Sequence, residues 1–90
     1  MSRDVEQMEF HILNKLYRQT NIGEDYIPFH DILQGLKPHQ RSMKDAVKAA
    51  ANLYKKGLVE FHKGKNCISI NRKQVNEVEA ILARRNGLQS

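Results

Sequence analysis

The stretch that decides the fold is residues 41–71, which read RSMKDAVKAAANLYKKGLVEFHKGKNCISIN. Its first half has the apolar spacing of an amphipathic helix. That helix is expected to stop at Gly57, because glycine adopts the left-handed backbone of a helix end without a Cβ clash. The second half alternates apolar and polar residues over 58–62 and 67–70, with a basic turn between. We therefore expect a helix followed directly by a β-hairpin.

A helix over residues 42–56 has two distinct faces at a step of about 100° per residue. Ser42 can cap this helix, and Asp45 follows at the third position after it. We expect the apolar face to pack inward, with Met43, Ala46, Val47, Ala50, Leu53 and Tyr54. We expect the opposite face to point outward, with Arg41, Lys44, Lys48, Asn52 and Lys55.

Further elements are expected on both sides of this unit. Helical spacing predicts a first helix over residues 5–20, and residues 26–29 are expected to be extended because Pro28 disfavours helix at the residue before it. Proline also restricts such a strand to a sheet edge, or is itself confined to the end of the strand. A short second helix over 30–36 and a final helix over 72–85 complete the order α-β-α-α-β-β-α. The inward stripe of the first helix comprises Val5, Met8, Ile12 and Leu16.

Length and composition fit one domain over residues 1–90, with a core over about residues 5–70. Hydrophobic residues make up 40% and charged residues 28%, which is ordinary for a globular protein. No apolar run approaches the length that spans a bilayer, and the first residues lack the apolar segment of a signal peptide. We therefore expect a cytoplasmic protein without a membrane partner, and its single cysteine excludes an internal disulfide.

The sequence carries none of the motifs that would indicate catalysis or metal binding. It has no glycine-rich phosphate loop and no nucleophile motif of the GxSxG type. Its four histidines and one cysteine lack the paired spacing of a zinc site. We therefore expect neither an enzyme, nor a bound metal, nor a cofactor.

Positive charge is concentrated in the middle of the chain. Residues 1–36 carry three basic and six acidic side chains, a net charge of −3, whereas residues 37–65 carry eight basic and two acidic ones, a net +6. Residues 66–90 have a net charge of +2. The basic segment coincides with the expected helix and hairpin, which is the electrostatic pattern of a protein that binds a polyanion.

The helix, the run LYKKGLV at residues 53–59 and the short basic hairpin together resemble the recognition helix and wing of winged helix-turn-helix proteins. The resemblance covers about residues 5–70 and implies a mainly α fold with a small β-hairpin, of the α+β class. The chain departs from the family pattern between Leu36 and Leu53, which lie 17 residues apart, a few more than the compact arrangement. Either the turn at residues 37–40 is long, or the third helix begins at Pro38.

The resemblance implies a DNA-binding transcriptional regulator. Its third helix would lie in the major groove of double-stranded DNA, and its basic wing on the flanking backbone or in the minor groove. Lysine neutralises phosphates, and arginine or asparagine can read base edges. The candidate DNA-binding residues are Arg41, Lys44, Lys48, Asn52, Lys55, Lys63, Lys65 and Asn66.

Two other classes of function remain open. The basic face could dock an acidic partner protein or serve only solubility, as in winged helix modules for protein–protein interaction. The chain could also be an RNA-binding component of a translation or processing complex.

The final helix leads to an expectation about assembly. Its apolar stripe needs a cover, and the first helix could supply one through Leu13 and Tyr17. The first helix already uses its main stripe on the second and third helices, so a second subunit is the better cover. We therefore expect a homodimer through the N- and C-terminal helices. The stripe comprises Val75, Val78, Ile81 and Leu82.

Overall fold

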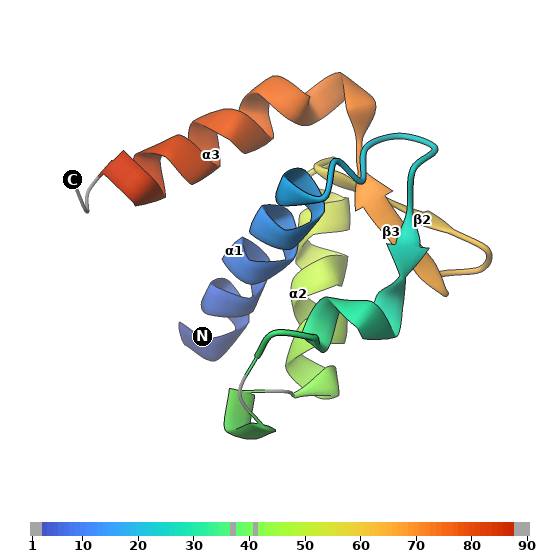
Figure 1. Cartoon of the computed structure of the whole chain (residues 1–90), viewed down its shortest axis with the longest axis vertical. Coiled ribbons are helices and arrows are strands. Elements are labelled where there is room, and N and C mark those ends of the chain that lie inside the picture. The colour runs from blue at the N-terminus through green and yellow to red at the C-terminus, as the bar shows by residue number, and fades with distance from the viewer. Residues whose placement is uncertain (1–2, 37, 41, 88–90) are drawn as a thin grey trace.

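The computed structural model describes residues 3–36, 38–40 and 42–87 of the chain. Within these residues three α-helices pack together and a small antiparallel sheet lies at one side of them, so the predicted α+β class is confirmed (Figure 1). The elements in chain order are α1 (Arg3–Arg18), β1 (Ile27–Pro28), the 3₁₀ helices η1 (Phe29–Leu33) and η2 (Pro38–Gln40), α2 (Met43–Lys55), β2 (Val59–His62), β3 (Cys67–Ile70), the 3₁₀ helix η3 (Arg72–Gln74) and α3 (Val75–Gly87).

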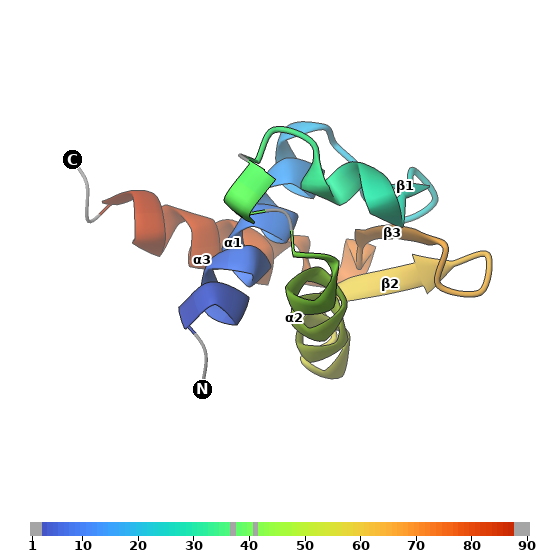
Figure 2. The ribbon, with the colours of Figure 1, turned by 90° about the horizontal axis from the view of Figure 1, so that it is seen from below.

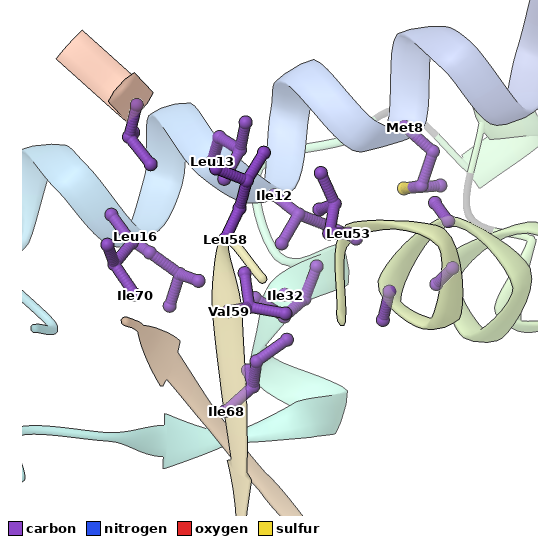
Figure 3. Close-up of a cluster of buried hydrophobic side chains, with 14 of the residues drawn as sticks. Met8, Ile12, Leu13, Leu16, Ile32, Leu53, Leu58, Val59, Ile68 and Ile70 are labelled. Atoms are coloured by element: carbon purple, nitrogen blue, oxygen red, sulfur yellow. The ribbon is translucent and has the colours of Figure 1, made fainter. Parts of the chain in front are cut away.

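Helices α1 and α2 lie side by side and form the centre of the core (Figures 1 and 3). The predicted stripe of α1 is confirmed, because all four of its residues are buried. Helix α2 contributes Leu53 and three alanines, which allow two helix axes to approach closely. The sheet closes the far side of this core with Val59, Ile68 and Ile70. The buried α2 alanines are Ala46, Ala49 and Ala50.

The three strands are ordered β1-β3-β2, and both pairings are antiparallel. Ile68 of β3 is the partner of Ile27 on one side and of Phe61 on the other. The predicted short strand around Pro28 is therefore confirmed, and so is its place at a sheet edge. An edge position suits proline because its nitrogen has no hydrogen to donate to a ladder.

The predicted second α-helix over residues 30–36 is wrong. The chain forms the five-residue 3₁₀ helix η1 instead, and Gly35 then turns the backbone with a φ of +92°. The segment between Pro28 and Gly35 is too short for a stable α-helix, since the first turn fixes several residues for one hydrogen bond. The turn that follows is the long one of the two alternatives, because η2 at Pro38–Gln40 is separate from α2.

The predicted inner face of α2 is only partly right. Ala46, Ala50 and Leu53 are buried, but Val47 and Tyr54 are 54% and 56% exposed. Met43 is also exposed, at 41%. The helix is rotated so that the small Ala49 faces α1 and the larger apolar residues border the hairpin. The close contact with α1 therefore places apolar side chains on the outside of α2.

Helix α3 packs across α1 within the same chain (Figure 1). Val78 is fully buried and Leu82 is 7% exposed, so most of the predicted stripe is already covered. Tyr17 Oη donates a 2.7 Å hydrogen bond to Glu79 Oε2, which is the main reason that the pKa of Tyr17 is raised. The premise of the homodimer prediction is therefore wrong, because α1 supplies the cover.

None of the helices in the described part of the chain combines the length and the apolar character needed to cross a bilayer.

The orientation of α2 can be tested by two substitutions six positions apart. We expect Leu53→Ala to lower the free energy of unfolding by about 2–5 kcal/mol, because it opens a cavity in the core. Val47→Ala should change it by no more than about 0.5 kcal/mol, because Val47 is largely exposed. Urea unfolding followed by circular dichroism measures both. A Val47→Ala loss as large as that of Leu53→Ala would contradict the observed rotation of α2.

Candidate nucleic-acid interface

Three lysines lie along the exposed side of α2, and Lys48 among them also borders the groove between α1, α2 and α3. Lys44, Lys48 and Lys55 are all exposed, and they span most of the helix. The helix begins where the sequence predicts, because the Ser42 hydroxyl accepts a 3.2 Å hydrogen bond from the backbone N–H of Asp45. This cap fixes the first turn and thereby the direction in which Lys44 leaves the helix.

Two more lysines lie on the turn of the β2–β3 hairpin, which extends away from α2 (Figure 2). Lys63, Gly64 and Lys65 all have positive φ angles, of 51°, 64° and 76°. This left-handed run forms a tight turn closed by the bond from Asn66 N–H to the Lys63 carbonyl at 3.2 Å. The backbone N–H of Phe29 also donates to the Asn66 carbonyl at 2.7 Å, so the turn is anchored to η1. Both lysine side chains and that of Asn66 remain exposed.

An apolar surface lies between α2 and the hairpin, and we call it the junction surface. It lines an open cavity of about 370 Å³ that also touches Lys55 and Lys65. The rings of Tyr54 and Phe61 meet across it with centroids 5.3 Å apart. Sequence reasoning missed this surface because it assigned Val47 and Tyr54 to the core. The residues of the junction surface are Phe29, Val47, Ala50, Ala51, Tyr54 and Phe61.

Asn52 does not lie with the other candidate residues. Its side chain is half-buried on the border that faces α1, and Nδ2 donates to Glu9 Oε2 at 3.2 Å. The other oxygen of Glu9 accepts from Lys56 Nζ at 3.1 Å. The amide thus contributes one of its N–H groups to the α1–α2 contact.

The face of the sheet away from the core is covered by the loop that precedes β1. Ser69 Oγ is buried and donates to the Gly23 carbonyl at 2.7 Å, so the His62 ring nitrogen 2.9 Å away must be the donor to that oxygen. The His62 ring also stacks on Tyr26 with centroids 4.4 Å apart. Lys63 Nζ lies 5.8 Å from the centroid of the same Tyr26 ring. These contacts fix the base of the hairpin turn.

Seven of the eight predicted site residues are described by the structure, and they fall into three groups. The lysines of α2 and those of the hairpin turn lie on opposite sides of the junction surface, with Asn66 beside the turn lysines. Asn52 faces α1 instead. Arg41 lies outside the described residues. Among the residues that the structure describes, no three histidine, cysteine or acidic side chains are grouped so that they could hold a metal ion.

No protein-family model, no curated protein and no solved structure matches this chain significantly.

The role of Asn52 gives a test that separates it from the lysines. We expect Asn52→Ala to lower the free energy of unfolding by about 0.5–1.5 kcal/mol, because the half-buried Glu9 loses a hydrogen-bond donor. Lys48→Ala, one helical turn away, should cost less than about 0.5 kcal/mol because its side chain is exposed. If Asn52→Ala and the native protein unfold at the same urea concentration, the amide does not stabilise the contact between α1 and α2.

Proposed function

We propose that this protein is a winged helix protein that binds double-stranded DNA and acts as a transcriptional regulator. Helix α2 would occupy the major groove, and the hairpin turn would contact the flanking backbone or minor groove. The observation that carries the proposal is the set of five exposed lysines on α2 and the turn. These are Lys44, Lys48, Lys55, Lys63 and Lys65.

The dimensions of α2 suit this placement. A helix of 13 residues is about 20 Å long, and the major groove is about 12 Å wide, which admits one α-helix. Lysines at both ends of α2 could therefore reach phosphates on either side of the groove. The hairpin projects beside α2 and would bring its two lysines to a neighbouring stretch of backbone (Figure 2).

The order of the elements supports a winged helix arrangement. A short strand before α2 pairs with the hairpin that follows it, and α2 packs on the first helix. The chain differs from the expected pattern in its second helix, where η1 and η2 replace one α-helix. This segment lies at the side of α2 and leaves the outer lysine face uncovered.

Binding through lysine and phosphate should depend strongly on salt. Each neutralised phosphate changes the slope of log K against log salt concentration by about −0.9. With four to five of the lysines in contact, we expect a slope of about −3.6 to −4.5 for a mixed-sequence duplex. Fluorescence anisotropy between low and physiological salt measures this slope. A flat response, or the absence of binding at low salt, would refute DNA binding.

A pair of charge-matched variants tests the location of the interface. Lys44→Ala with Lys48→Ala should make the salt slope shallower by about 2, since two phosphate contacts are lost. Arg18→Ala with Lys73→Ala removes the same charge from two exposed positions away from the junction surface. This control should leave the slope nearly unchanged.

Equal effects of the two pairs would mean that net charge, and not the α2 surface, governs binding. Melting temperatures of both double variants should stay close to that of the native protein, because all four side chains are exposed.

A protein partner is the second candidate, and the junction surface favours it. Exposed valine and aromatic side chains beside lysines could receive an acidic amphipathic segment of another protein.

RNA binding is the other alternative, and it would use the same exposed lysines. A duplex DNA complex that survives a mass excess of competitor RNA would favour DNA. A complex that RNA displaces would favour the RNA-binding reading.

The homodimer through the N- and C-terminal helices stays a prediction. Its remaining support is the groove between α1, α2 and α3, where Phe10 and Ile81 are half-buried. Sedimentation at micromolar concentration should then give twice the mass of one chain. A mass equal to one chain would contradict the homodimer. DNA binding through one α2 helix does not require a dimer.

A further inference from the structure

The junction surface lies where a bound duplex would have to pass. Val47 is 54% exposed, Ala51 is exposed, and both line the same cavity as Lys55 of α2 and Lys65 of the turn. A single ligand that reaches the lysines on both sides must therefore cover these two side chains. The proposed interface has an apolar centre between two basic borders.

The apolar centre limits which chemical group can lie against it. A hydrogen-bonding base edge placed against valine or alanine would lose its water without gaining a partner, which is unfavourable. Of the groups that base pairs present in the major groove, the thymine C5-methyl is the apolar one. A methyl group against Val47 or Ala51 instead removes apolar area from water on both sides, which is favourable.

Helix α2 has few polar side chains that could recognise base edges by hydrogen bonds. Between Met43 and Lys55 the sequence has no arginine and no glutamine, and its single asparagine, Asn52, donates to Glu9. The lysines of the outer face are long, flexible point charges that suit phosphates. Tyr54 is a further polar residue of the junction surface, and its ring packs against Phe61. Val47 and Ala51 are the small apolar side chains left for contact with base edges.

We infer that Val47 and Ala51 contact thymine methyl groups in the major groove, so that the protein binds thymine-containing DNA better than DNA without these methyls. The inference rests on the proposed function, because it requires α2 to lie in the groove. It adds a chemical preference to a surface whose lysines alone would bind any duplex.

The test compares two duplexes that differ only in the methyl groups. A 20-base-pair mixed-sequence duplex with half A·T pairs is prepared once with thymine and once with deoxyuridine, which keeps charge and pairing. We expect the deoxyuridine duplex to bind about fourfold more weakly for each methyl buried at the interface. The salt slopes of the two duplexes should be equal, since the phosphates are unchanged.

Variants of the protein assign the preference to the junction surface. Val47→Ser removes both methyl groups of the side chain and leaves a hydroxyl, so the ratio of thymine to deoxyuridine affinity should fall towards one. Ala51→Ser serves as an independent second variant with the same expectation. Lys44→Ala should weaken binding to both duplexes by the same factor and leave the ratio unchanged.

The outcomes separate this inference from the proposed function. Equal affinity for the two duplexes overturns the methyl contact and leaves DNA binding in place. A native ratio in both Val47→Ser and Ala51→Ser also overturns it. No binding to either duplex overturns both proposals. Val47-dependent binding of an acidic amphipathic peptide of glutamate and leucine, without duplex binding, would assign the surface to a protein partner.

Discussion

The close packing of α2 on α1 determines which side chains of α2 are exposed on the molecular surface. Three alanines of α2 are buried, and their small side chains bring the two helices together around Ile12 and Leu53 (Figure 3). A helix that buries alanines must turn its larger residues elsewhere. The rotation that buries Ala49 therefore exposes Val47 and Tyr54 beside the hairpin, and it leaves the lysines facing outward.

The hairpin is held in place by contacts with β1 and η1 as well as by the packing of Phe61 against Tyr54 of α2. Its strands pair with β1, and the buried Ser69 hydroxyl joins the sheet to the loop that precedes β1. The turn is tied to η1 through the Asn66 carbonyl. The two sets of lysines are therefore carried by elements that are already packed together, which sets their separation before any ligand binds. Such pre-organisation lowers the entropy lost when a ligand is bound.

Strong local patterns in the sequence predicted most of the architecture. The stripe from Val5 to Leu16 identified α1, and alternation around Phe61 and Ile68 identified the two strands of the hairpin. The 3₁₀ segment was missed because Ile32 and its apolar neighbours have helical spacing, which cannot show that five residues are too few for an α-helix. The packing of α3 on α1 was missed because the apolar spacing of a helix shows which of its faces is buried but not which element covers that face.

The candidate site was predictable in its charges but not in its apolar part. Lysine positions follow from helical periodicity alone, and the exposure of Lys44, Lys48 and Lys55 agrees with that expectation. Whether Val47 faces the core depends on how closely α2 approaches α1, which depends on the whole set of buried side chains. For the same reason the sequence placed Asn52 on the outer face, although it meets Glu9.

The central claim is that α2 and the hairpin turn form one interface for double-stranded DNA. Amide chemical shifts of the ¹⁵N-labelled protein, recorded while a duplex is added at low salt, test it most directly. We predict the largest changes within α2 and at the turn around Gly64, and the smallest within α3. Changes centred on α1 and α3 with α2 unaffected, or no changes at all, would contradict the account.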